Sequence, residues 1–86
     1  MPDTERGLDR DAAHALVVDV LTEIAPGPEL DALTLDEDLR EALGLDSLDY
    51  RNLVAQVSQR SGRRIEEDDY QRLTNLDGWI TFLTES

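Results

Sequence analysis

Apolar residues in the first third of the chain recur with the spacing of one face of an α-helix. The stripe has steps of three and four positions and consists of Ala13, Leu16, Val17, Val20, Leu21 and Ile24. Asp9 and Asp11 are suited to cap this helix and to place negative charge at its positive end. Pro26-Gly27-Pro28 stops it, because proline lacks the amide donor that a helix interior requires. The pattern predicts a first long helix that ends before residue 26.

Two more helical stripes follow in the second half of the chain. The first begins at Ser47 and contains Tyr50, Leu53, Val54 and Val57. Gly62 is suited to end that helix in a left-handed conformation, and positive charge near its C-terminus comes from Arg60, Arg63 and Arg64. The last stripe follows Thr74 or Asn75 as a cap and contains Leu76, Trp79, Ile80 and Leu83. Because Trp79 falls within this stripe, we expect it to pack in the core.

The long segment from Glu29 to Asp46 connects the first two helices. Its leucines recur often enough to hold it on a core, with a helical turn predicted around Glu37 to Leu43; they are Leu30, Leu33, Leu35, Leu39, Leu43 and Leu45. A short helix is predicted where the acidic cluster 66–69 precedes Tyr70 and Leu73. No stretch alternates with period two. The expected fold is therefore an all-α bundle of three longer helices plus one short helix, with a long loop between helices 1 and 2.

The chain length fits one domain. With 86 residues and 9.7 kDa, the sequence is too short for two cores. Residues 1–8 are polar and charged, so we expect a flexible leader, not a signal peptide, followed by a single domain over 9–86. The longest clean apolar run, Ala15 to Val18, is too short to span a bilayer. We expect a cytoplasmic monomer without membrane insertion.

Charge and composition exclude several classes of function. Twenty acidic residues against eight basic ones give a net charge of −12, which disfavours nucleic acids and anionic membranes and favours basic protein partners. Cysteine is absent, so disulfides and thiolate metal sites are excluded. His14 is the one histidine, which disfavours a His-based metal site and a self-contained Ser/His/Asp triad. We expect His14 on the surface, no metal site, and no enzymatic activity.

The acidic clusters do not have the pattern of a cation site. An EF-hand loop that starts at Asp36 requires glycine at its sixth position, where this chain has Glu41. The cluster over 66–69 suits the start of a helix. Asp46 and Asp49 are a possible acid–base pair, but nothing in the sequence builds an enclosed pocket around them.

The segment Leu43-Gly44-Leu45-Asp46-Ser47-Leu48-Asp49 is different, because it places a hydroxyl at the first position of an amphipathic helix after a glycine-containing apolar turn. On spacing alone, the simpler interpretation of Ser47 is a helix cap. The segment also resembles the Asp-Ser-Leu attachment motif of acyl carrier proteins. The resemblance covers roughly Leu8 to Leu83 and includes the long first loop, Ile65 and Thr74-Asn75-Leu76.

The resemblance implies a carrier without catalytic activity of its own. In this family a phosphopantetheinyl transferase of the holo-acyl-carrier-protein synthase type attaches 4′-phosphopantetheine from coenzyme A to the serine, here Ser47. Asp46 matches the residue that helps bind magnesium in the transferase complex. The thiol of the arm then holds an acyl group as a thioester.

The resemblance also assigns two surfaces. The partner face comprises Leu48, Asp49, Arg51, Asn52 and Ala55, and it meets the transferase, an acyl-loading ligase or acyltransferase, and condensing or acyl-transferring enzymes. The acyl groove comprises Val54, Val57, Ile65, Leu73 and Leu76. This partner face is usually rich in acids, whereas here much of it is basic or neutral. We therefore expect a freestanding, specialised carrier.

Three interpretations follow for the function. The first is an acyl carrier protein for fatty acid, polyketide or related lipid biosynthesis. The second is an aminoacyl or peptidyl carrier of a nonribosomal peptide-type pathway, which uses the same chemistry with another cargo. The third, from a different class, is an unmodified acidic helical adaptor that binds basic proteins.

Overall fold

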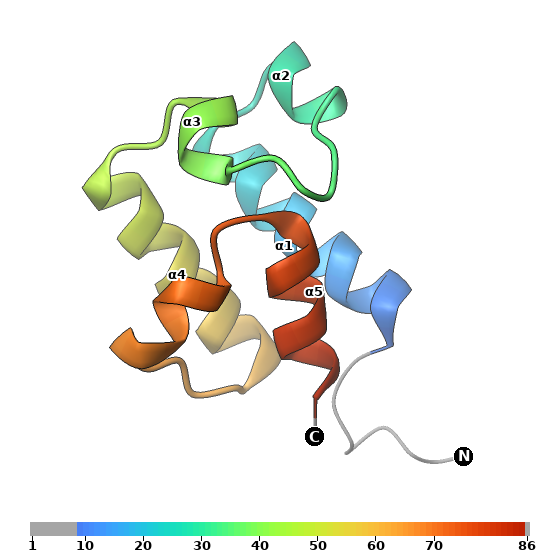
Figure 1. Cartoon of the computed structure of the whole chain (residues 1–86), viewed down its shortest axis with the longest axis vertical. Helices are drawn as coiled ribbons and strands as arrows, with labels where there is room; N and C mark the ends of the chain where they lie inside the picture. The colour runs from blue at the N-terminus through green and yellow to red at the C-terminus, as the bar shows by residue number, and fades with distance from the viewer. Residues whose placement is uncertain (1–8, 86) are drawn as a thin grey trace.

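The computed structural model describes residues 9–85, which form helices and loops without a strand. The helices are α1 (Arg10–Ile24), α2 (Pro28–Asp31), α3 (Leu39–Leu43), α4 (Ser47–Ser61), the 3₁₀-helix η2 (Glu67–Arg72) and α5 (Leu76–Thr84). Helix α1 packs against both α4 and α5 (Figure 1). The all-α bundle with three longer helices is confirmed. The predicted leader over 1–8 lies outside the described residues.

The helix ends lie where the sequence signals place them. Asp9 caps α1, since its carboxylate accepts a hydrogen bond of 2.7 Å from the amide of Ala12. Of the two candidate caps for α5, Asn75 is the one used, and it accepts 2.8 Å from the amide of Gly78. Gly62 ends α4 in the left-handed region at φ 74°, as predicted.

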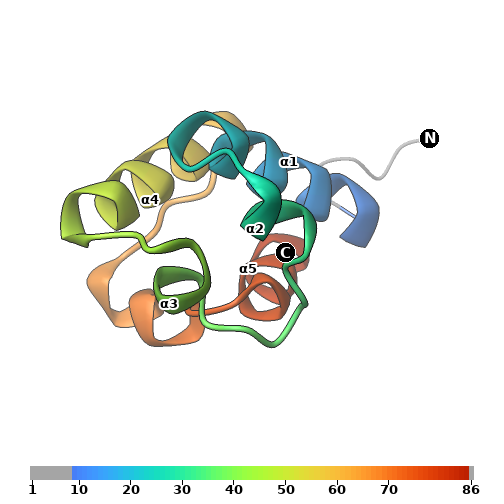
Figure 2. The same ribbon diagram turned by 90° about the horizontal axis from the view of Figure 1, so that it is seen from above.

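The connection between α1 and α4 contains more helix than expected. Helix α3 falls within the predicted turn, but the four-residue α2 was missed, although proline at the first helical position was a signal for it. The predicted short helix over the acidic cluster is present as η2. Figure 2 shows α3 on the side of the bundle away from α1. Backbone hydrogen bonds hold this segment in place, from Leu39 N–H to Thr74 O at 2.8 Å and from Asp77 N–H to Leu35 O at 3.0 Å.

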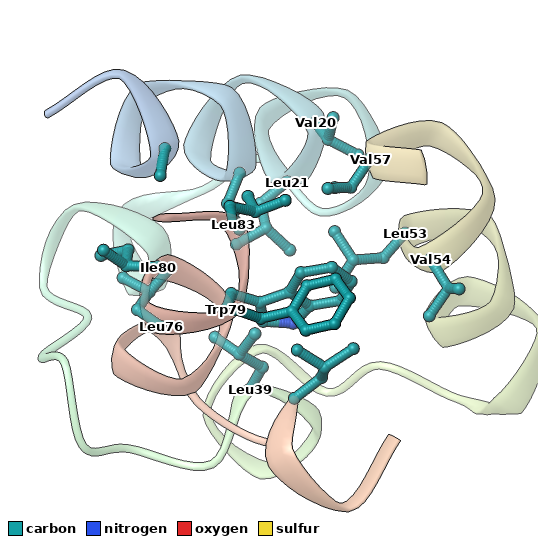
Figure 3. Packing of buried hydrophobic residues seen from close by; sticks show 14 of the residues in the cluster. Val20, Leu21, Leu39, Leu53, Val54, Val57, Leu76, Trp79, Ile80 and Leu83 are labelled. Atoms are coloured by element: carbon teal, nitrogen blue, oxygen red, sulfur yellow. The ribbon is translucent and has the colours of Figure 1, made fainter. Parts of the chain in front are cut away.

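The core lies between the three longer helices and α3. Trp79 is fully buried, as predicted, and Figure 3 shows it with Leu39 on one side and Leu21 and Leu83 on the other. Leu39 and Leu45 attach the long connection to this core, whereas Leu35 is 46% exposed. Burial of these side chains stabilises the attachment of the long connection to the bundle.

Arg63 links the end of α4 to α5, since its backbone is hydrogen-bonded to Ser58 and Ser61 and its side chain extends to α5. Its guanidinium donates to the carbonyl oxygens of Phe82, at 3.0 Å, and Glu85, near the end of α5. The same group lies 4.6 Å from the centre of the Phe82 ring. Arg64 pairs with Glu66 instead. Arg63 therefore attaches the loop after α4 to α5.

Within residues 9–85, no helix combines the length and the apolar character that a crossing of the bilayer requires.

Candidate functional site

Ser47 is presented by a tight turn between α3 and α4. Gly44 ends α3 in the left-handed region at φ 69°, where glycine is favoured. The amide of Leu45 donates to Arg40 O at 3.0 Å, and the Leu45 side chain is buried. After Leu45 the chain turns toward the surface, and Asp46 and Ser47 are both exposed. A buried leucine thus anchors the turn that exposes the hydroxyl.

The cap of α4 is Asp46, and the interpretation of Ser47 as the cap is wrong. Asp46 has extended backbone, and its carboxylate accepts 2.8 Å from the amide of Asp49. Ser47 is the first helical residue, and among the described residues its hydroxyl accepts no hydrogen bond from an amide of the first turn. The hydroxyl is therefore not used to stabilise the helix.

The hydroxyl of Ser47 meets a cation and no base. Its one hydrogen-bond partner among the described residues is the Arg40 guanidinium, at a long 3.5 Å from Nη2 to Oγ. A serine without an adjacent base is a weak nucleophile. Any reaction at this oxygen therefore requires a base from another protein.

A cavity of about 290 Å³ opens beside Ser47. It is lined from α3, α4, η2 and the loop before α5 by Asp38, Arg40, Ser47, Tyr50, Arg51, Tyr70 and Thr74. Its apolar wall is an aromatic pair, since the rings of Tyr50 and Tyr70 meet edge to face with centres 5.6 Å apart. The site thus combines an exposed hydroxyl, two guanidinium groups and an aromatic wall.

Tyr50 is fixed in this wall. Its hydroxyl donates to Leu73 O at 3.2 Å, and the Arg40 guanidinium lies 5.8 Å from its ring centre. Burial raises the pKa of Tyr50 to about 12, and the neighbouring Tyr70 contributes in the same direction. The Tyr50 hydroxyl therefore stays protonated and keeps its hydrogen bond at physiological pH.

The residues expected on the partner face lie together on α4, directly after Ser47. Arg51, Asn52 and Ala55 are exposed, and Asp49 is half-buried. Leu48 is 72% exposed and is one of two large apolar side chains exposed in residues 9–85. Leu48 therefore lies exposed directly after Ser47.

The residues expected to line the acyl groove belong to the packed core. Val54, Val57, Leu73 and Leu76 are buried, and Ile65 packs against the same cluster. The cavity beside Ser47 is lined by other residues, and none of these five is among them.

Sequence reasoning missed most of the residues that build this cavity. Arg40, Tyr70 and Thr74 come from three segments that only the fold brings together. The sequence predicts Tyr70 only as part of the short helix after the acidic cluster, and it gives Arg40 no role. The unusual basic character next to the motif was the one available signal.

The acidic clusters have structural roles. Asp38 caps α3, with its carboxylate accepting from the amides of Arg40 and Glu41 at 2.9 and 3.1 Å. Asp36 accepts from the hydroxyl of Thr34 at 2.8 Å. His14 lies exposed on α1. In the part of the chain that the structure describes, no three His, Cys, Asp or Glu residues gather as metal ligands would.

The structure is thus a small helical domain with an exposed serine at the start of α4. The sequence matches the family model described as "Phosphopantetheine attachment site" over residues 14–83. The chain belongs to this family of carrier proteins, whose members carry a covalent 4′-phosphopantetheine arm. A search of curated proteins gave no significant match.

Carrier domains of this family meet phosphopantetheinyl transferases and acyl-processing enzymes, and they are generally non-catalytic. The residues around Ser47 fit the arm, because the hydroxyl is exposed, is not used as a cap and borders a cavity with cationic groups.

Proposed function

We propose that the arm is attached at Ser47 and that residues 9–86 form one acyl carrier domain for fatty acid, polyketide or related lipid biosynthesis. The observation that supports Ser47 is the transfer of the capping role to Asp46, which leaves the serine hydroxyl exposed and available. When attached, the arm supplies a thiol that holds the cargo as a thioester. The chain has no cysteine of its own to provide such a thiol.

The chain itself contributes position and recognition. Asp46 holds the first turn of α4 rigid, and Leu45 anchors the preceding turn, so that Ser47 Oγ is displayed at a fixed place. Since no base lies beside that oxygen, the proton must be removed by the transferase. This division of tasks suits a non-catalytic carrier that is processed by other proteins.

The attachment is tested by incubating the purified protein with coenzyme A and a promiscuous phosphopantetheinyl transferase. We expect intact mass spectrometry to show the gain of one phosphopantetheine group, and peptide mapping to place it on Ser47. A protein that gains no mass with any transferase tried would instead be an unmodified adaptor.

The acidic surface and the Leu-Gly-Leu-Asp-Ser-Leu-Asp segment support acyl cargo over aminoacyl or peptidyl cargo. The two are separated by offering the arm-bearing protein to acyl ligases and to amino-acid adenylating enzymes. Loading by an adenylating enzyme alone would make the protein a peptidyl carrier.

We propose that the acyl groove lies among Val54, Val57, Ile65, Leu73 and Leu76. These side chains now pack against one core cluster, so a chain held there has to displace apolar contacts and replace them with its own methylenes. A sequestered chain therefore raises the melting temperature of the acylated protein above that of the form with the free arm. Equal melting temperatures would place the chain outside the bundle.

Leu48 is expected to be the main apolar contact for partner enzymes. Replacing it with serine removes an apolar anchor next to Ser47, and we expect kcat/KM for transfer of the arm to fall by about tenfold, a typical effect for one interface anchor. Leu35→Ser is the matched control, since Leu35 is the other exposed large apolar residue and lies before α3. An equal loss in both variants would remove Leu48 from the partner face.

Asp46 is expected to act in magnesium binding with the transferase in addition to capping. Asn caps a helix as well as Asp does, so Asp46→Asn keeps the hydrogen bond to Asp49 and removes the charge. We expect a loss of transfer rate of roughly 10- to 100-fold that rising magnesium partly restores, at nearly unchanged thermal stability. An unchanged rate would leave Asp46 with a capping role alone.

A further inference from the structure

Two arginines beside Ser47 differ from the other arginines of the described chain. The others are held by carboxylates or by backbone carbonyl oxygens; they are Arg10, Arg60, Arg63, Arg64 and Arg72. Within residues 9–85, Arg40 and Arg51 form no ion pair, although the chain carries twenty acidic residues. Both line the cavity that Ser47 borders. Two cations without a counter-ion thus meet at the attachment residue.

The two guanidinium groups approach Ser47 from different elements. Arg40 extends from α3, lies 3.5 Å from Ser47 Oγ and rests 5.8 Å from the ring centre of Tyr50. Arg51 lies four positions after Ser47 on α4, which places it on the same face of the helix one turn along. An anion bonded to Ser47 Oγ is therefore within reach of a cation from each side.

The carboxylates beside the cavity and beside Ser47 do not pair with these cations. Asp38 is the one acidic residue that lines the cavity, and it accepts hydrogen bonds from two amides at the start of α3. Asp46 is likewise bonded to an amide, at the start of α4. Both carboxylates cap helices, and neither forms an ion pair with Arg40 or Arg51 in the described chain.

We propose that Arg40 and Arg51 bind the phosphodiester of the arm and hold the arm's first segment in the cavity, against Tyr50, Tyr70 and Thr74. The inference rests on attachment at Ser47. The phosphodiester is bonded directly to Ser47 Oγ and carries one negative charge, and arginine is the side chain best suited to phosphate oxygens. The aromatic wall offers an apolar surface to the methyl and methylene groups that follow. The arm therefore has a bound state on the carrier itself.

The inference is tested on fully converted proteins by amide NMR and by ³¹P NMR. Amide shifts of Tyr70 and Thr74 are compared before and after attachment, because these residues are remote from Ser47 in sequence and border the cavity. We expect both amides to shift in the wild type, and the ³¹P resonance of the attached phosphodiester to differ between the wild type and the variant that lacks both arginines. Added salt should reduce all three effects, since the contacts are between exposed charges.

The variants are Arg40→Gln, Arg51→Gln and the double substitution, with Arg64→Gln as control. Arg64 is exposed and pairs with Glu66, away from the cavity lining. Loss of two exposed charge contacts is expected to lower the bound population of the arm by roughly fivefold in the double variant, and the control is expected to match the wild type. If a variant fails to fold, the salt series on the wild type still tests the proposal. Amide shifts that added salt does not reduce would contradict binding by the two arginines.

The outcomes separate this inference from the attachment itself. If no mass is gained at Ser47, the attachment proposal and this inference both fail. If the mass is gained but Tyr70 and Thr74 do not shift, the arm swings free. If they shift equally with and without the two arginines, the arm lies in the cavity but the arginines do not hold it. Either result overturns this inference alone.

Discussion

Ser47→Ala is expected to abolish attachment of the phosphopantetheine arm and to leave the fold intact. The reaction requires the serine oxygen, and no neighbouring group replaces it, since the residues on either side are Asp46 and Leu48. The hydroxyl makes no capping bond, and alanine has the higher helix propensity, so α4 loses nothing. Intact mass after treatment with transferase and coenzyme A measures the first effect, and thermal unfolding measures the second.

Two controls make this result specific. Thr81→Ala removes another exposed hydroxyl, on α5, and is expected to gain the arm as the wild type does. Asp46→Ala removes the true cap and is expected to cost about 1 kcal/mol of stability, against nearly none for Ser47→Ala. If Ser47→Ala destabilised the protein as much as Asp46→Ala, the assignment of the cap would be wrong. If it still gained the arm, the attachment residue would be another one.

The helices could be predicted because each rests on local signals. Stripes of apolar residues, capping side chains and terminal glycines act within a few residues of one another, and they located α1, α4 and α5. The capping side chains of Asp9 and Asn75 and the left-handed Gly62 mark ends of these helices. The family resemblance of the motif around Ser47 rests on the same local segment.

Local sequence signals could not decide whether Asp46 or Ser47 caps α4. Both side chains are strong caps, and only the backbone decides which of them can reach an open amide. In the structure Asp46 is extended, with φ −90° and ψ −176°, while Ser47 is already helical. The buried Leu45 fixes where the turn ends and so determines which residue becomes the cap.

The cavity beside Ser47 could not be predicted from the sequence, for a different reason. Its wall joins α3, α4 and η2, which the hydrogen bond from Leu39 to Thr74 and the contact of Tyr50 with Tyr70 bring together across the fold. Contacts between segments that are distant in the chain produce no periodic pattern in the sequence. The same holds for Arg63, whose partner carbonyls at Phe82 and Glu85 are distant in the chain.

Gly78→Ala is expected to destabilise the protein strongly, against what helix propensity predicts. Gly78 lies in the first turn of α5, where alanine would otherwise be favoured by about 1 kcal/mol. A Cβ at this position would fall well inside van der Waals contact of the Arg72 carbonyl oxygen and 3.1 Å from its carbon. Because the obstacle is backbone, either η2 or α5 has to move.

The expected loss is about 3 kcal/mol, at the upper end of typical overpacking costs. For a domain of this size that corresponds to a fall in melting temperature of roughly 12–24 °C. Thermal unfolding followed by circular dichroism measures it, with two-state behaviour checked by a second probe.

Gly44→Ala and Gly62→Ala are the matched controls for this effect. Both positions lie in the left-handed region, at φ 69° and 74°, but a Cβ there meets nothing within 4 Å. Backbone strain alone then costs about 1 kcal/mol in each. We therefore expect Gly78→Ala to be clearly the most damaging of the three. A stabilised Gly78→Ala protein would mean that η2 does not pack against the first turn of α5, and the wall that Tyr70 and Thr74 give to the Ser47 cavity would lose its support.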